Sequence, residues 1–235
     1  LPGNQVVHIA EGPEQSVLIL TDKGLGQIVF EKMTLEDKAM VFEKQVRQRH
    51  TRYGINSNVS RVQDGDLATA QNTIADSDNL WTGMYMGSQL FRYLVTKSED
   101  AKQNCIESFE AMERLHQITS IKGLFGRTYE RSGYYEFKKE YRDYVENYWY
   151  EGYNNNVSWN HSADPEWDWR ASASSDQTVG QFFALVLMAE YMDDPDLKQR
   201  AINLLDDMVG YMVANNYTLV DVDGKPSLWG RWNPE

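Results

Sequence analysis

The apolar residues of this chain follow two different helical patterns. Segments 80–95 and 179–192 are apolar on almost every side, since the first has no charged residue before Arg92 and the second has only Glu190. Three other segments combine one apolar stripe with one charged face: 35–49, 101–119 and 197–213. A helix with one stripe faces water on its other side, whereas a helix without a polar face must be covered all round. The pattern therefore predicts outer and inner helices that alternate along the chain.

The connections between these helices differ in length. Two are short turns, 96–100 and 193–196, and both follow an inner helix. Long connections, 50–79 and 120–174, lead from outer to inner helices, and a third begins at residue 215. Hairpins arranged in a ring would place all the long connections on one rim. Long loops in a compact domain are uncommon and are often functional, so we expect this rim to be the functional face.

The first 31 residues follow a strand pattern instead. Apolar, β-favouring residues cluster in three short runs: 6–9, 17–21 and 27–30. The sequence thus predicts a mostly α protein, with a β-rich segment over 1–31 and a partial (α/α) toroid of helical hairpins over 32–235. The β-rich segment would pack on the helices or end an upstream β domain. Because the alternation calls for an inner helix after residue 235, we expect the toroid to be truncated at its C-terminus.

Composition narrows the range of functions. Asp and Glu number 35 and Lys and Arg 23, a net charge of −12, which argues against a nucleic-acid partner because phosphate binding needs a basic surface. No apolar run approaches the roughly 20 residues of a membrane-spanning helix. The single cysteine, Cys105, lies on an apolar stripe and is interpreted as a core residue.

No metal or other cofactor is expected. The four histidines show no HxxxH or HxH spacing, and the chain has no phosphate-binding glycine loop. The segment 221–224 resembles the start of a calcium loop, but Trp232 occupies the loop's twelfth position, where a glutamate would be needed. A hairpin turn at Asp223-Gly224 is the better interpretation.

Two aspartates occupy matching places before the inner helices. Asp78 lies in segment 76–82 and Asp176 in segment 172–178. One explanation is structural, because an aspartate stabilises a helix N-terminus by about 1 kcal/mol. The other is catalytic, because glycoside hydrolysis needs one carboxyl group to protonate the leaving oxygen and another to activate water or attack the anomeric carbon. In the catalytic interpretation Asp176 is the acid or base and Asp78 is its partner.

The connection 120–174 is rich in aromatic, asparagine and arginine residues, most densely over 144–170. Flat rings stack on the faces of sugars while Asn and Asp bind hydroxyls, although such rings also fill cores. A guanidinium suits the carboxylate of a uronic acid, although pairing with nearby acidic residues is the simpler explanation of these arginines. The candidate substrate-binding residues are Arg127, Arg170, Trp167, Trp169, Trp81, His161 and Trp229.

Four segments together resemble a group of uncharacterised bacterial (α/α)6-toroid proteins, which is similar in fold to six-hairpin glycosidases. They read DSDNLWTGMY (76–85), FGRTYER (125–131), SSDQ (174–177) and DVDGKPSLWG (221–230). The resemblance implies a toroid, often behind a β domain, and export to the periplasm or cell surface of a Bacteroidetes-like cell. Unsaturated glucuronyl hydrolases, which are characterised toroids, use two aspartates at the inner rim, and Asp78 and Asp176 match by their place in the topology.

The leading functional hypothesis is a glycoside hydrolase that acts on oligosaccharides, with uronate-containing glycans among the candidates. The alternative is a non-catalytic glycan-binding or architectural module of a larger exported protein. A sugar epimerase is a third option, but it would normally use paired histidines, and His161 stands alone. In each case the expected partner is a carbohydrate, and the oligomeric state is left open.

Overall fold

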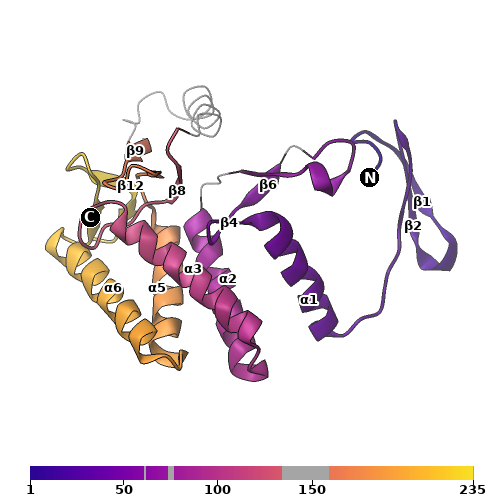
Figure 1. Cartoon of the computed structure of the whole chain (residues 1–235). Helices are drawn as coiled ribbons and strands as arrows, with labels where there is room; N and C mark the ends of the chain where they lie inside the picture. The colour runs from indigo at the N-terminus through magenta and orange to yellow at the C-terminus, as the bar shows by residue number, and fades with distance from the viewer. Residues whose placement is uncertain (61, 74–76, 134–158, 235) are drawn as a thin grey trace. The chain divides into compact units, whose positions relative to one another are not determined.

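The computed structural model describes residues 1–60, 62–73, 77–133 and 159–234. The chain divides into two compact units (Figure 1). The first unit comprises Leu1–Thr51 and Asn58–Thr73, and the second comprises Arg52–Ser57 and Ile74–Glu235. The boundary expected after residue 31 falls inside the first unit.

The first unit begins with an antiparallel three-stranded sheet in the order β1-β2-β3. Its strands are β1 (Val6–Glu11), β2 (Val17–Thr21) and β3 (Gly24–Ile28), with a short 3-10 turn (Pro13–Gln15) between the first two. The strands predicted over 6–9 and 17–21 are therefore confirmed, whereas the third strand covers Gly24–Ile28 rather than residues 27–30. Many apolar side chains of this sheet, including Val7, Ile9 and Leu25, are exposed.

The rest of the first unit consists of one helix and a small strand pair. Helix α1 (Leu35–Gln45) begins with a capping box, in which the Thr34 hydroxyl accepts the Asp37 backbone N–H and the Asp37 carboxylate accepts the Thr34 N–H. The remaining elements are a π-helical turn (Val46–His50), β6 (Asn58–Ser60), a 3-10 turn (Leu67–Thr69) and β7 (Gln71–Thr73). Strands β6 and β7 form an antiparallel pair.

The second unit contains two helical hairpins. Their helices are α2 (Asp78–Thr96), α3 (Glu99–Gln117), α5 (Ser175–Tyr191) and α6 (Pro195–Ala214). Lys97, in the left-handed conformation, ends α2, and the Ser98 hydroxyl caps α3. In the second hairpin the Asp194 carboxylate caps α6, whose first residue is Pro195. Both turns lie where the sequence predicts them.

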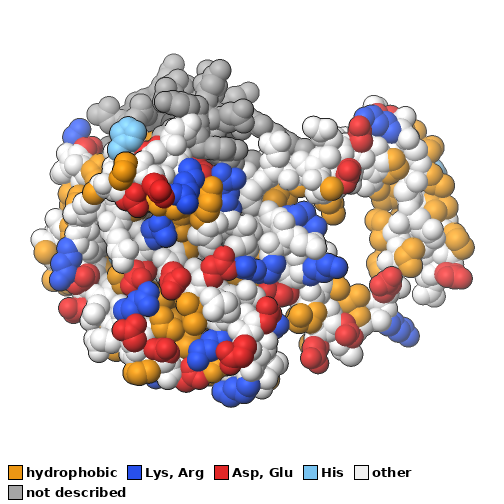
Figure 2. Space-filling view, in the orientation of Figure 1, with side chains coloured by type: hydrophobic (Ala, Val, Ile, Leu, Met, Phe, Trp, Pro, Cys, Tyr) orange, Lys and Arg blue, Asp and Glu red, His pale blue; other side chains and the backbone are white. Residues whose placement is uncertain are grey.

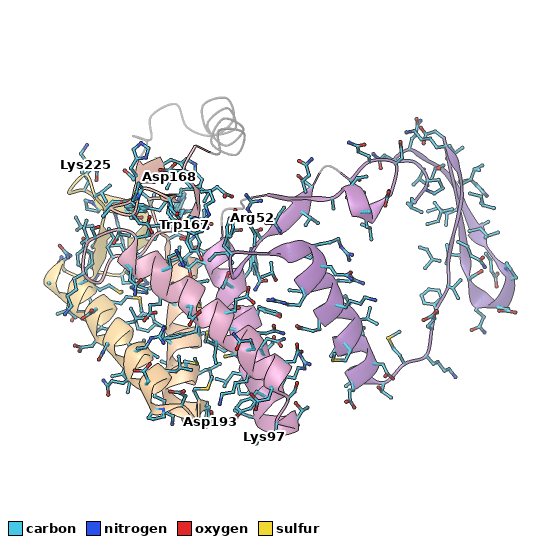
Figure 3. All side chains as sticks on the ribbon, in the orientation of Figure 1. Arg52, Lys97, Trp167, Asp168, Asp193 and Lys225 are labelled. Atoms are coloured by element: carbon cyan, nitrogen blue, oxygen red, sulfur yellow. The ribbon has the colours of Figure 1, made fainter. Side chains whose placement is uncertain are left out.

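Helices α2 and α5 lie side by side and run parallel. At their N-terminal ends the Ser77 hydroxyl donates to the Asp176 carboxylate, and near their C-terminal ends the rings of Phe91 and Tyr191 lie 6.4 Å apart. Figure 3 labels Asp193 and Lys97 at this second end of the helical layer, and Trp167 and Asp168 at the first. The N-terminal ends of α2 and α5 therefore share one end of the second unit.

Glycines allow α2 and α5 to approach each other closely. A Cβ atom added to Gly83 would lie 2.7 Å from the carbonyl oxygen of Gly180, and one added to Gly180 would lie 2.7 Å from the Cα of Leu80. One turn further on, a Cβ on Gly87 would lie 2.6 Å from the ring of Phe183. At Gly83 and Gly180 the nearest atoms are backbone, so backbone packs against backbone at this crossing, whereas Gly87 makes room for the Phe183 ring.

The outer helices cover one side of this pair. Buried residues from all four helices form one core cluster, among them Met86, Phe109, Leu185 and Ala201. Cys105 belongs to it and is fully buried, as predicted, and burial raises the pKa of its thiol to about 12. On the side visible in Figure 2, over α3 and α6, acidic and basic side chains are interspersed, as expected of helices that face water on one side.

Small sheets cover the end at which α2 and α5 begin. A three-stranded antiparallel sheet has the order β8-β10-β9, with β8 (Thr128–Arg131), β9 (Trp159–His161) and β10 (Trp167–Arg170). Strands β11 (Thr218–Val220) and β12 (Pro226–Arg231) form the predicted hairpin, with Gly224 in its turn at φ 74°. The short strands β4 (Thr51–Arg52) and β5 (Ile55–Asn56) form a further pair.

Two predictions about the fold are wrong. The fold is mixed α/β rather than a mostly α partial toroid: a six-hairpin toroid needs about twelve helices, whereas the described residues form five α-helices together with several small sheets. The inner helices are also not covered all round, because Trp81, Met84 and Phe91 on α2 are each about half exposed. Amphipathic periodicity predicts which helix faces are apolar, but it does not show how many hairpins there are or what covers each face.

The contact between α2 and α5 predicts that Gly180→Ala destabilises the protein. The new methyl group would collide with backbone of α2, and overpacking of this kind typically costs about 1–3 kcal/mol. Gly210→Ala on α6 is the matched control, since nothing lies within 4 Å of a Cβ there and an alanine favours a helix by about 0.5–1 kcal/mol. Urea unfolding of both variants measures the difference, and equal stability of the two would refute the proposed close contact.

Candidate functional site

The candidate site lies where α2 and α5 begin. Ser174 and Gln177 form a capping box at the start of α5, and the Ser174 hydroxyl also donates to the Asp176 carboxylate. Ser77 stands at the N-cap of α2, but its hydroxyl makes no capping bond and donates instead to Asp176 Oδ2 at 2.6 Å. Asp176 itself is exposed. Two serines from separate helix ends therefore fix one accessible carboxylate.

The environment of Asp176 favours its ionised form. Partial burial acts to raise the pKa of the carboxyl group, but hydrogen bonds from Ser174 and Ser77 and the positive charge of Arg127 outweigh it and lower the pKa below the usual 3.8. The position in the first turn of α5 acts in the same direction. Asp176 is therefore an anion at neutral pH.

An exposed tryptophan lies on the same helix face as Ser77. Trp81 follows Ser77 by one helical turn, its backbone N–H donates to the Ser77 carbonyl oxygen at 3.1 Å, and its side chain is 48% exposed. On α5, Val179 follows Asp176 by three residues and is exposed as well. We call the surface formed by Ser77, Trp81, Asp176 and Val179 the Asp176 surface.

A chain of buried polar side chains lies beneath this surface. The Gln181 amide donates to Asn79 Oδ1 at 2.9 Å, and the Asn79 amide donates to the Gly126 carbonyl oxygen at 3.4 Å. Gln181 Oε1 is therefore left to accept from His116 Nε2 at 3.3 Å. These bonds join α2, α3 and α5 to the loop before β8, and they fix the ends of the three helices relative to one another.

Asp78 lies near Asp176 in the structure, but its side chain does not belong to the Asp176 surface. It is adjacent to Ser77, the residue that binds Asp176, yet its side chain is fully buried. Its carbonyl oxygen accepts from the Thr82 hydroxyl at 2.7 Å, and Thr82 in turn accepts the backbone N–H of Asn56 at 2.9 Å. The structure thus brings the two helix ends together, while only one of the two carboxylates is accessible.

Arg127 is buried between two acidic groups rather than presented to solvent. Its side chain is 3% exposed, and its Nε donates to the Ser172 carbonyl oxygen. Its charge acts on Asp176 and on Asp221. Burial raises the pKa of Asp221, although the Val222 and Ser172 backbone N–H groups partly stabilise its anion. Arg127 therefore balances acidic groups within the second unit.

The predicted aromatic and arginine residues separate into buried and exposed groups. Arg170, Trp167 and Trp169 lie on β10 and are 1%, 6% and 2% exposed. The Trp167 ring contacts the guanidinium groups of Arg131 and Arg114, 3.9 and 4.6 Å from its centroid. Such placement makes β10 a core strand, and any effect of its residues on a ligand would be indirect.

Three predicted binding residues remain exposed: Trp81, His161 and Trp229. Of these, Trp81 belongs to the Asp176 surface, whereas His161 ends β9 and Trp229 lies on β12. The first part of the predicted aromatic stretch, residues 144–158, lies outside the described residues.

One arrangement was not predicted from the sequence. His161 Nδ1 lies 2.6 Å from Asp168 Oδ1, and the same oxygen accepts from the Ser132 hydroxyl at 3.1 Å. Asp168 is fully buried, whereas the His161 side chain is 88% exposed (Asp168 is labelled in Figure 3). A buried carboxylate that holds Nδ1 leaves the other ring nitrogen facing solvent, as acid–base histidines require. Asp168 and His161 are opposite each other on β10 and β9, and this pairing brings their side chains together. The spacing of the two residues in the sequence does not reveal it.

Comparison with known proteins gives no family assignment: no family model, no curated protein and no solved structure matches this chain. The resemblance to six-hairpin glycosidase-like proteins therefore stays an expectation. Within the described part of the chain, no group of three or more acidic, histidine or cysteine side chains is arranged to hold a metal ion. No helix among those residues has both the length and the hydrophobicity needed to cross a membrane.

The buried His116 predicts a loss of stability in mild acid. Burial lowers the pKa of its imidazole from 6.5 to about 4, although Gln181 favours the charged form slightly. Between these values the unfolded chain binds more protons than the folded one, so stability is full above pH 6.5 and decreases as the pH falls toward 4. This single group should remove about 2 kcal/mol between pH 7 and pH 5.

Urea unfolding at pH 7 and pH 5 tests this prediction, with His116→Gln as the comparison because glutamine does not titrate. The wild type should lose about 2 kcal/mol more than the variant over this interval. Equal losses in the two proteins would show that His116 does not stay neutral in the fold.

Proposed function

We propose that this protein binds neutral oligosaccharides at the Asp176 surface. The observation that carries the proposal is the placement of an exposed indole, Trp81, one turn from a serine that holds an ionised carboxylate, Asp176. A flat apolar ring beside fixed hydrogen-bonding groups is the combination that recognises a sugar, which has an apolar C–H face and a polar edge.

The carboxylate has capacity for a ligand. An ionised aspartate offers about four acceptor positions, and two of those on Asp176 accept from Ser77 and Ser174. The remaining positions can accept from sugar hydroxyls, and these charge-assisted bonds are stronger than neutral ones. Because the carboxylate is held from two helix ends, little side-chain freedom is lost when a ligand binds.

The charges near this surface favour a neutral sugar over a uronate. The guanidinium groups of Arg127 and Arg170 are buried, so they do not offer a partner for a substrate carboxylate. Asp176 is negative, as is the chain as a whole, with a net charge of −12. A uronate would therefore meet repulsion, and the preference for uronate-containing glycans is not part of this proposal. Export to the periplasm or cell surface remains part of the proposal.

Binding should depend on both Trp81 and Asp176. Screening of the wild type on an array of neutral and acidic oligosaccharides, followed by titration calorimetry with the best ligand, gives the reference affinity. Trp81→Ala should weaken binding about fivefold or more, since stacking contributes on the order of 1 kcal/mol or more. Asp176→Asn, which keeps the shape but removes the charge, should weaken it by a similar factor.

Phe91→Ala is the matched control for Trp81. Phe91 is on the same helix, is 46% exposed, and lies at the other end of α2 from Asp176. Its removal should leave the affinity unchanged. Equal weakening by Trp81→Ala and Phe91→Ala, or a wild type that binds only acidic glycans, would contradict the proposal.

Hydrolysis of a glycosidic bond is the second candidate function. It is favoured by the lowered pKa of Asp176, which keeps the carboxylate ionised, as a general base or nucleophile requires. Asp78 is buried, so the second carboxyl group of such a mechanism would have to come from another residue. Binding without cleavage requires no second group and is therefore the better supported function.

Release of reducing ends from neutral oligosaccharides distinguishes the two functions. Under the hydrolase hypothesis the wild type is active, Asp176→Asn reduces the rate by at least a hundredfold, and its melting temperature changes by only a few degrees. His161→Gln is the second variant: loss of activity in it alone would move the chemistry to the pair formed by His161 and Asp168. A wild type that binds sugars and releases no reducing ends would leave binding as the function.

A further inference from the structure

Within the second unit, one face of the α2–α5 pair is apolar and is not covered by any of that unit's described residues. On α2 the outward residues are Met84, Ser88, Phe91 and Val95, and on α5 they are Val179, Phe183, Val186 and Glu190. Both sets follow the spacing of four, three and four residues that coiled-coil seams show. The apolar members range from 37% exposed for Phe183 to 84% for Val95. We call these residues the seam face.

The seam face is suited to helices rather than to an extended peptide. Because α2 and α5 are parallel and in close contact, their seams form two adjacent ridges with a shallow groove between them. The ridges of other helices fit into such a groove. Charged residues are absent from the middle of both seams, and Glu190 lies only at the end of one. A partner is therefore selected by shape and apolar area and not by charge.

We propose that the seam face is the dimer interface of this protein, and that its occupant is a second copy of the chain. A second copy presents the same two ridges, so that two pairs of helices pack into a four-helix layer, and two-fold dimers of this kind are the most common oligomers. Val179 belongs to both surfaces, but Asp176 and Ser77 lie beyond the N-terminal end of the seams. Variants at Phe91 and Val186, which are outside the Asp176 surface, therefore test this inference separately from the proposed carbohydrate binding.

The available area agrees with a dimer of modest affinity. From the exposed fractions of its apolar residues, the seam face offers roughly 600 Å² per copy. A dimer that covered it completely would bury roughly 1,200 Å², near the lower limit of specific interfaces. A patch of this size is at the upper end of what monomers expose, and such patches are often functional. We expect a dissociation constant on the order of micromolar.

The net charge gives the dimer a distinctive salt dependence. Each copy carries −12, so two copies repel each other while the apolar interface attracts them. Added salt screens the repulsion and leaves the apolar contact in place. Association should therefore become stronger as sodium chloride is raised from 50 to 500 mM, whereas a contact held by ion pairs would become weaker.

Analytical ultracentrifugation of the full chain over a concentration series tests this inference. The wild type should form dimers, and Phe91→Asp on α2 and Val186→Asp on α5 should each weaken association at least tenfold while leaving the circular dichroism spectrum unchanged, because both side chains face solvent in the monomer. Ile202→Asp on α6 is the control, since Ile202 is 44% exposed and lies outside the seam face.

Three outcomes would overturn the inference: a wild type that stays monomeric at hundreds of micromolar, a dimer that survives both seam variants, or one that Ile202→Asp weakens equally. Sugar titration of Phe91→Asp separates this inference from the proposed function. A monomeric variant that still binds sugar supports both proposals, and a dimeric wild type without sugar affinity removes only the binding proposal.

Discussion

The second unit depends on the contact of two helix backbones without intervening side chains. At Gly83 and Gly180 the separation of α2 and α5 is set by backbone atoms, and this spacing determines what happens at both ends of the pair. At one end it brings Ser77 to Asp176, and in the interior it places Gln181 within hydrogen-bonding distance of Asn79. A wider crossing would break these bonds and leave buried amides without partners, which is strongly unfavourable.

Local features of the fold followed from the sequence to a large extent. Periodicity located the four helices of the second unit, and the turn at Gly224 was expected to close a hairpin. Each of these depends on residues close together in the chain. The prediction that the helices form a ring was wrong. An apolar helix face shows that burial of the face is favourable, but it does not show which segment covers it. The small sheets around the helix ends were missed for the same reason, since strands of three or four residues carry almost no periodic signal.

The candidate site shows the same division. The sequence placed Asp78 and Asp176 at the starts of two apolar helices, and helix boundaries carry that information. That these two helices pack side by side, with Ser77 bonded to Asp176, comes from the structure alone. The burial of Asp78 was not predictable, since it depends on the loop that covers α2. Likewise, the pairing of His161 with Asp168 is set by the register of β9 on β10, which a shift of one residue would abolish.

The crossing of α2 and α5 also has a consequence for the order of folding. Each helical hairpin is local in sequence, but the bond between Gln181 and Asn79 joins residues 102 positions apart. Contacts of such long range form late, because the intervening chain must first be closed into a loop. During synthesis at about 5–20 residues per second, α2 leaves the ribosome roughly 5–20 s before α5 is complete. The face of α2 that packs against α5 therefore stays exposed to solvent throughout that interval.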